Sequence, residues 1–359
     1  MVAIFNEFKS SIPEIIEEAR NGRMFVLVDD EDRENEGDII VPAQMATPEV
    51  INFMATYGRG LICLAMPPAQ IGRLALPLMP QRHESRFGTA FTLSIEAATG
   101  VTTGISAPDR ARTIAVAIDP NVQQGDIQTP GHVFPLLARE NGTLERTGHT
   151  EAAVDIARLA GLNPSGVICE IMNEDGDMAR RDDLVAFCEK HGLKIGTIAD
   201  LVAYRLATES LIEQVNEEPF ETEFGDGFRI ITFREQEDPT APEILALVKG
   251  DIAPEAETLT RVHALNMRRD LLGGGGKSSL PAAIRTVNEE GKGVIVLINS
   301  PDSMEKLPPD QALRTYGLGA QVLVKLGVRK MILLSNASRE LVGLEGFGLQ
   351  VAGYRGLSE

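Results

Sequence analysis

Short apolar segments alternate with polar loops and helical patterns through the first half of the chain. A helix is predicted after Ser11, because Ser11 and Glu14 have the spacing of a capping box and Asn21-Gly22 ends the run. Strand-like segments cover residues 24–28, 39–41, 61–66, 90–95, 114–118 and 167–172. Helical patterns cover residues 151–160 and 181–191. Strands that alternate with helices predict a layered domain in which helices cover a sheet.

The pattern changes near residue 206, where we place a domain boundary. Residues 209–224 are acid-rich and poorly periodic, which is typical of a linker or an exposed sheet edge. Strand-like segments return at residues 228–233, 243–249, 294–298 and 330–334, and a helix is predicted between Pro309 and Leu326. With 359 residues and roughly 150 residues per domain, two domains are expected, over residues 1–205 and 206–359.

Composition narrows the class of protein. Acidic residues outnumber basic ones by 52 to 34, a net charge of −18 that disfavours nucleic acid and anionic membrane surfaces as partners. Three cysteines, Cys63, Cys169 and Cys188, do not have the spacing of a disulfide framework. The N-terminus lacks a signal-peptide pattern, and no apolar run is long enough for a membrane span. We therefore expect a cytoplasmic protein.

The most unusual segment is DDEDRENEGD at positions 29–38. A solvated turn is the ordinary interpretation of an acidic run. Here Arg33 lies among the carboxylates, and Glu34, Glu36 and Asp38 alternate, so an extended backbone would project them to one side. Packed carboxylates repel one another unless a cation lies between them, and oxygen ligands suit Mg²⁺ or Mn²⁺. The segment predicts a metal site.

A second candidate site directly precedes the helix predicted at residues 151–160. It consists of Arg146, Thr147, Gly148, His149 and Thr150. Glycine allows close approach of a ligand, and the free N–H groups at a helix start bind anions. The two threonines have an alternative role as helix caps. His149 is a candidate metal ligand or acid–base group.

Two further polar residues lie in unexpected surroundings. Glu170 falls within the apolar strand 167–172, where a carboxylate is paired, exposed or kept for function. His132 follows the turn-like sequence Thr129-Pro130-Gly131, which predicts a loop position for its imidazole. A structural role is the ordinary interpretation of either residue alone. Cys63, in a strand pattern, is expected to be a buried apolar residue.

Five ordered blocks in the first half resemble one enzyme family. They are DDEDRENEGD, GVTTGISAPDRARTI (100–114), TPGHVFPL (129–136), RTGHTEAAVDIARLAGL (146–162) and GVICEIMNEDG (166–176). Together they resemble 3,4-dihydroxy-2-butanone 4-phosphate synthase over nearly all of residues 1–205. The resemblance implies an α+β protein: a layered mixed-sheet domain flanked by helices, followed by a smaller α/β domain.

The resemblance also implies a function. The family is a lyase of riboflavin biosynthesis that converts D-ribulose 5-phosphate into 3,4-dihydroxy-2-butanone 4-phosphate and formate. It uses Mg²⁺ or Mn²⁺, with two divalent ions expected per site, and works as a homodimer whose active sites lie near the subunit interface. A non-catalytic protein that binds metal or metabolites is the alternative. What argues against it is the joint presence of Arg33, Glu34, Asp38, His132, His149 and Glu170.

Site roles follow from the same resemblance, position by position. It implies Glu34 and His149 as metal ligands. It implies His132 and Glu170 as essential catalytic residues and makes Glu36 a candidate for proton transfer. The substrate-binding residues implied are Arg33, Glu34, Asp38, Arg146, Thr147, Gly148, His149 and Thr150.

Residues 310–350 resemble the end of GTP cyclohydrolase II, an enzyme with a zinc ion held by three cysteines. Asn266, Lys277 and Ser279 stand at the cysteine positions, and no cysteine follows Cys188. Without thiolates that zinc site cannot form, so we expect no zinc and no hydrolysis of GTP. An enzyme with both activities is the alternative.

A glycine-rich run, Gly273 to Gly276 followed by Lys277-Ser278, invites interpretation as a phosphate-binding loop. It fails the pattern because Leu271 occupies the first glycine position. A flexible loop at the position of the lost metal site is the favoured interpretation. The second half is then an assembly or regulatory module, or a folded remnant.

Overall fold

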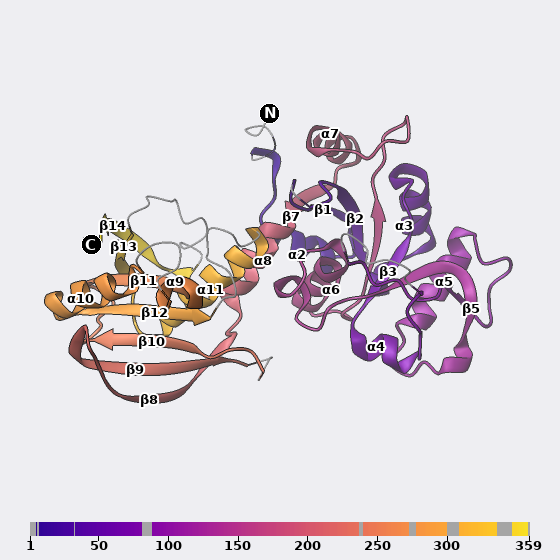
Figure 1. Ribbon diagram of the computed structural model, residues 1–359. Helices are drawn as coiled ribbons and strands as arrows, with labels where there is room; N and C mark the ends of the chain where they lie inside the picture. The colour runs from indigo at the N-terminus through magenta and orange to yellow at the C-terminus, as the bar shows by residue number, and fades with distance from the viewer. Residues whose placement is uncertain are drawn as a thin grey trace. The chain divides into compact units, whose positions relative to one another are not determined.

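The computed structural model describes residues 5, 7–31, 33–80, 88–236, 240–272, 278–299, 309–335 and 347–357. The chain separates into two compact units, Met1–Val202 and Ala203–Glu359 (Figure 1). Helix α8 (Ile198–Thr208) crosses the division, so the boundary predicted near residue 206 falls inside a helix. Among the described residues, no helix is long and apolar enough to cross a membrane.

The first unit combines short strands with helices. Its strands are β1 (Phe25–Val28), β2 (Gly37–Pro42), β3 (Cys63–Met66), β4 (Ile95–Ala97), β5 (Ile127–Leu137), β6 (Gly166–Glu170) and β7 (Lys194–Thr197). Its α-helices are α2 (Ile12–Arg20), α3 (Pro48–Phe53), α4 (Pro68–Arg73), α5 (Ala107–Ala117), α6 (His149–Leu159) and α7 (Arg181–His191).

A mixed sheet with the strand order β4-β5-β3-β6-β2-β1-β7 forms the centre of this unit. β2 pairs antiparallel with β1 and β6, whereas β3 and β5 are parallel. On one face, α6 packs so closely that a Cβ at Gly166 would lie 2.7 Å from the Cβ of Ala153. On the other face, Ile51 of α3, Ile114 of α5 and Leu184 of α7 belong to one apolar core. Because helices cover both faces, β1 and β2 are buried along their whole length, and β1 is continuously apolar.

Several local predictions are confirmed. The capping box of Ser11 and Glu14 is present at the start of α2, and Glu14 Oε2 accepts the Ser11 N–H at 2.9 Å. The helix predicted at residues 151–160 is α6, which begins two residues earlier than expected. Residues 167–172 correspond to β6 and residues 61–66 to β3.

Three local predictions are wrong. Residues 114–118 belong to helix α5 and to its C-cap, because Ser106 caps the helix start and the apolar positions face the core at helical spacing. Most of 90–95 is irregular, and the strand there is β4, Ile95–Ala97. His132 does not lie in a loop, since the Thr129–Pro130 segment runs inside the long strand β5.

The second unit is built on its own sheet, with the order β14-β13-β11-β12-β10-β9-β8. Its strands are β8 (Ile212–Thr222), β9 (Gly225–Glu235), β10 (Ile244–Lys249), β11 (Glu257–Leu265), β12 (Gly293–Asn299), β13 (Lys330–Leu334) and β14 (Gln350–Arg355). Its helices are α9 (Met267–Asp270), α10 (Leu280–Glu290) and α11 (Pro309–Lys325).

The acid-rich stretch at residues 209–224 is largely strand β8, which lies exposed at the edge of the sheet. Of the two alternatives predicted for it, the exposed sheet edge is confirmed and the linker is not. The four strand-like segments predicted after it lie in β9, β10, β12 and β13, and the predicted C-terminal helix is α11. Helix α10 packs on an apolar cluster that includes Phe228 and Ile295.

Candidate active site

The acidic segment forms the loop between β1 and β2, and Asp29 organises it. The Asp29 side chain is fully buried and forms an ion pair with Arg33 Nη1 at 2.9 Å. Its two oxygens also accept the backbone N–H groups of Glu34 at 3.0 Å and of Glu36 at 2.8 Å. One buried carboxylate therefore holds the loop that carries the predicted metal and substrate residues.

The loop is not extended throughout, in contrast to the prediction from the alternating acids. Glu34 lies in a turn, and Asn35 adopts a left-handed φ of 54°. Arg33 Nη1 lies 2.5 Å from Glu34 Oε2, and Arg180 donates to the Glu34 carbonyl oxygen at 2.9 Å. The turn, rather than strand alternation, directs the Glu34 carboxylate.

His149, the first residue of α6, brings a distant part of the chain to this loop. Its imidazole is buried, and its Nε2 lies 3.2 Å from the carbonyl oxygen of Leu27 in β1. A carbonyl only accepts, so Nε2 carries the proton in this contact. Nδ1 then faces Glu34 Oε2 at 3.9 Å and Asp38 Oδ1 at 3.8 Å. These separations are too long for hydrogen bonds.

The donor set fits a divalent cation. Ligand atoms of Asp29, Glu34 and His149 all lie within 4.8 Å of one another. Asp38 Oδ1 is buried and has no hydrogen-bond partner in the described part of the chain. Carboxylate oxygens with one imidazole suit Mg²⁺ or Mn²⁺. Both Asp29 oxygens already accept hydrogen bonds from the loop backbone, so Glu34 and His149 are the better candidates for metal ligands.

Burial and neighbouring charges shift the pKa values of the carboxyl groups and the imidazole in this site. Burial favours protonated Glu34, but His149 and Arg33 outweigh it and lower the pKa of Glu34 to about 2. Burial disfavours the imidazolium, yet the carboxylates of Asp38 and Glu34 raise the pKa of His149. Burial raises the pKa of Asp38, and His149 opposes this only in part. Glu36 has a raised pKa because of burial and the nearby Glu34.

Mn²⁺ is expected to bind more tightly as the pH rises from about 6 to 8. Metal ligation needs the neutral imidazole, so the proton that the carboxylates hold on His149 must leave. Below the raised pKa of His149, the affinity should rise about tenfold per pH unit. Isothermal titration calorimetry in buffers of different ionisation enthalpy measures both the affinity and the proton release. His149→Asn is expected to remove this slope, and a pH-independent wild-type affinity would contradict the assignment.

The segment Arg146–Thr150 leads into α6 beside this cluster. Arg146 Nη1 lies 2.5 Å from Oε2 of Glu151, whose side chain is 1% exposed, and Nη2 donates to Thr89 Oγ1 at 3.0 Å. Gly148 is the N-cap residue, so a threonine cap, the alternative role for Thr147 and Thr150, is absent at that position. The first-turn N–H groups of a helix are available to an anion.

Glu170 ends strand β6 directly opposite Asp38 of β2. Cross-strand partners point to the same face, so the two carboxylates are neighbours. Glu170 Oε2 accepts the Leu61 N–H at 2.8 Å. A Cβ at Gly60 would lie 2.5 Å from both this oxygen and the Glu170 carbonyl oxygen, so the approach of the β6 backbone requires a glycine there. The structure thus brings Glu170 to the acidic cluster, which consists of Asp29, Glu34, Asp38 and His149.

His132 lies on β5, which is separated from β2 by β3 and β6. Its Nδ1 lies 2.7 Å from Glu96 Oε2, and its side chain is 44% exposed. Within one chain, His132 is therefore not in direct contact with the Glu34–His149 cluster. Glu96 and Glu151, which contact the predicted site residues His132 and Arg146, were not singled out from the sequence. The available signal was a carboxylate among apolar residues at the end of a predicted strand.

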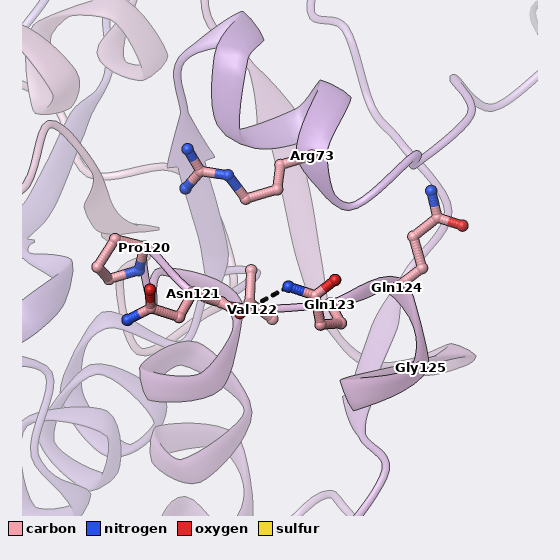
Figure 2. A pocket seen from close by; sticks show the side chains of 7 residues that line it. All are labelled: Arg73, Pro120, Asn121, Val122, Gln123, Gln124 and Gly125. Carbon is pink, nitrogen blue, oxygen red and sulfur yellow. Dashed lines mark hydrogen bonds between the residues drawn. The ribbon is translucent and has the colours of Figure 1, made fainter.

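A surface cavity of about 570 Å³ lies elsewhere in the first unit, lined by Arg73 and residues 120–125. Figure 2 shows Arg73 facing the side chains of Asn121 and Gln123 across it. None of the site residues predicted from the sequence lines this cavity. Its lining has no carboxylate or histidine, so it does not compete with the acidic cluster as a metal site.

In the second unit, a hydrogen-bonded network occupies the segment where GTP cyclohydrolase II would hold its zinc ion. His263 Nε2 lies 3.0 Å from Asp270 Oδ2, with both side chains buried. Asp270 also accepts the Asn266 N–H at 2.8 Å and the Ser278 hydroxyl at 2.6 Å. Lys277 and the glycine run 273–276 lie outside the described residues.

Two family models match the sequence. A model described as 3,4-dihydroxy-2-butanone 4-phosphate synthase matches residues 13–204, and one described as GTP cyclohydrolase II matches residues 213–307 and 302–356. The 3,4-dihydroxy-2-butanone 4-phosphate synthase of Pseudomonas aeruginosa is 49% identical over 96% of this chain and 98% of its own. The riboflavin biosynthesis protein RibBA of Aquifex aeolicus is 47% identical over 96% of this chain and 92% of its own.

Solved structures agree with the sequence matches. RibBX, a two-domain 3,4-dihydroxy-2-butanone 4-phosphate synthase from A. baumannii, matches 98% of this chain and 100% of its own with a TM-score of 0.82 and 41% identity. A 3,4-dihydroxy-2-butanone 4-phosphate synthase in complex with two magnesium ions matches 56% of this chain and 98% of its own, with a TM-score of 0.54 and 40% identity. The two-domain match confirms the predicted α+β fold.

Proposed function

Because the chain belongs to the 3,4-dihydroxy-2-butanone 4-phosphate synthase family, lyases of riboflavin biosynthesis, we propose that its first unit converts D-ribulose 5-phosphate into L-3,4-dihydroxy-2-butanone 4-phosphate and formate. The observation that carries this proposal is the convergence of Glu34 and Asp38 on His149. A loop and a helix start more than a hundred residues apart meet there at a site suited to a divalent cation.

Glu34 and His149 hold Mg²⁺ or Mn²⁺ in this proposal, with two ions per site; a related synthase was solved in complex with two magnesium ions. A cation bound there supplies Lewis-acid stabilisation of the negative charge that develops when the proton beside the ketone is removed. Asp29 fixes the loop geometry, and Arg33 keeps Glu34 ionised. Arg33 and Asp38 also contact the substrate.

Several proton transfers follow from the overall reaction. One water leaves and one returns as the five-carbon phosphate becomes a four-carbon phosphate and formate, so the atoms balance without a further reactant. Glu36, Glu170 and His132 are the acid–base groups we assign to these transfers. Glu36 lies in the acidic loop, where burial and the charge of Glu34 raise its pKa, and Glu170 lies opposite Asp38 on the neighbouring strand.

The phosphate of the substrate lies at the start of α6 in this proposal. The buried Glu151 forms an ion pair with the Arg146 guanidinium and so fixes its position. The arginine side chain therefore need not be ordered when it binds a phosphate. Thr147, Gly148 and Thr150 add hydroxyl and backbone N–H donors at the positive end of the helix.

A homodimer is the proposed assembly, with active sites near the subunit interface. The half-exposed His132, remote from the acidic cluster along the sheet, fits a site that a second copy completes. We assign the protein to the cytoplasm, in keeping with its free, buried cysteines Cys63, Cys169 and Cys188. Light scattering tests the assembly by giving twice or once the mass of the chain.

The activity is tested by a carbon-13 NMR time course with labelled D-ribulose 5-phosphate and Mg²⁺, beside an EDTA control. Formate and the four-carbon phosphate should appear only with metal. No conversion by a folded, metal-loaded protein would favour the alternative of a non-catalytic binding protein.

For the second unit, we propose an assembly or regulatory role without GTP hydrolysis. In support, no cysteine follows Cys188, and the hydrogen bonds of Asp270 tie together the segment where the metal would bind. A relative named RibBA keeps open the alternative of two activities.

Purified protein is expected to contain less than about 0.1 zinc per chain and to leave GTP unchanged, because the thiolates of a tetrahedral site are missing. Elemental analysis by mass spectrometry and chromatography of the nucleotide pool measure these outcomes. Stoichiometric zinc together with formate release from GTP would establish the bifunctional alternative.

A further inference from the structure

Glu96 is a buried carboxylate that none of the assigned roles uses. It lies on β4, is 5% exposed, and its Oε1 is 3.5 Å from the Thr113 hydroxyl. Its other oxygen, Oε2, lies 2.7 Å from His132 Nδ1 on β5. A buried carboxylate needs a strong hydrogen-bond donor, and among the described contacts the imidazole is the closest one.

This contact determines which nitrogen of His132 carries the proton. An ionised carboxylate only accepts hydrogen bonds, so Nδ1 is the donor toward Glu96. In the neutral ring Nε2 is then unprotonated, on the side of the ring away from Glu96. The His132 side chain is 44% exposed, and Nε2 has no hydrogen-bond partner among the described residues. The ring is therefore held at Nδ1 by the buried Glu96, whereas part of the side chain is exposed.

The backbone around the pair leaves little freedom to the carboxylate. A Cβ at Gly104, whose φ is +87°, would lie 2.1 Å from Glu96 Oε2. Asp109 holds this loop by accepting the Gly104 N–H at 3.0 Å and the Thr102 hydroxyl at 2.7 Å. On the imidazole side, a Cβ at Gly131 would lie 2.0 Å from the Ile95 carbonyl carbon, so β5 is pressed against β4. Carboxylate and ring are fixed from both sides.

We propose that Glu96 is a positioning residue, which holds His132 in the Nδ1–H tautomer with its Nε2 lone pair directed outward for proton transfer with the substrate. The inference rests on the proposed catalytic role of His132 and goes beyond it by assigning a function to Glu96. Carboxylates that orient an imidazole in this way act on its tautomer and direction, not by touching the substrate.

Glu96→Gln in the full-length, metal-loaded protein is the test. The amide is equally able to donate to or accept from Nδ1, so the tautomer preference should be lost. We expect kcat to fall about 100-fold while KM and Mn²⁺ affinity stay within about threefold, an effect typical of lost outer-shell orientation. In the His132→Gln background, Glu96→Gln should cause no further loss, because it acts through the imidazole.

The tautomer is read directly by nitrogen-15 NMR of the ring nitrogens, since the chain has only five histidines. Glu140→Gln, an exposed glutamate, is the matched control and should leave both kcat and the His132 signals unchanged. Unshifted His191 and His263 signals report that the variant is folded. If Glu96→Gln is not folded, Glu96→Asp is the second variant, because it keeps the buried charge on a side chain too short to contact His132 Nδ1. The same losses in kcat and in tautomer preference are expected.

The outcomes separate the two assignments. Wild-type kcat or an intact Nδ1–H tautomer in Glu96→Gln overturns the positioning role. A loss in the double variant much larger than in His132→Gln alone also overturns it, since Glu96 would then act elsewhere. If His132→Gln itself is fully active, the catalytic role of His132 fails first, and the inference about Glu96 fails with it.

Discussion

Glu34→Gln is expected to lower kcat by at least about a thousandfold, corresponding to about 4 kcal/mol of transition-state stabilisation, and to abolish tight Mn²⁺ binding. Glutamine has nearly the same shape, so the change removes the charge and leaves the loop in place. Glu34 is the carboxyl whose pKa falls to about 2, and its Oε2 faces His149 Nδ1 at 3.9 Å. Formate production and calorimetry of Mn²⁺ binding measure the two effects.

Glu31→Gln is the matched control for this variant. Glu31 belongs to the same acidic run, but its side chain is 58% exposed and pairs with Arg181 at 2.7 Å. Exposed ion pairs contribute little, so its activity should stay within about twofold of wild type. Should Glu34→Gln keep more than a tenth of the wild-type kcat, the assignment of Glu34 as a metal ligand would be wrong.

Glu170→Gln is expected to separate catalysis from metal binding. We predict a fall in kcat of about 100- to 1000-fold, the usual contribution of an acid–base group, with Mn²⁺ affinity nearly unchanged. Thermal stability should stay equal or rise, because the charge of Glu170 raises the pKa of Asp38 across the strand pair and so opposes the ionisation of Asp38. Calorimetric melting and steady-state kinetics measure these quantities on one preparation.

The control here is Glu174→Gln, a few residues further along the chain, with a side chain 89% exposed. It should behave as wild type in both assays. Loss of Mn²⁺ binding in Glu170→Gln would instead place Glu170 in the metal site, and unchanged kcat would remove it from the catalytic set.

The sequence pattern predicted an element correctly where interactions within that element determine its structure. The capping box at Ser11 and the apolar strand that became β6 needed only their own residues, and both are present. Residues 114–118 misled because β-branched side chains favour strands in isolation. There the Ser106 cap and burial of Ile114 against the core decide for a helix.

The family resemblance read from five ordered blocks is confirmed by the family models and the relatives. The same blocks identified the residues of the candidate site, whose roles remain predictions. Of these residues, Glu34, Asp38, His149 and Glu170 come together at one end of the sheet. Their recognition needed no geometry, because the family resemblance named these positions, whereas the local pattern alone left a structural role as the ordinary interpretation of Glu170.

The sequence by itself therefore determined the family, most of the elements and the chemical inventory of the site. Only the tertiary structure decided which buried acid holds which partner: Asp29 the loop backbone, Glu151 the Arg146 guanidinium, and Glu96 the imidazole 36 residues away. Asp29 and Glu151 contact residues seven and five positions away, through the turn of the acidic loop and the start of α6, whereas Glu96 and His132 meet because β4 pairs with β5. A local pattern shows that a carboxylate is present, but its partner is decided by the fold that buries it.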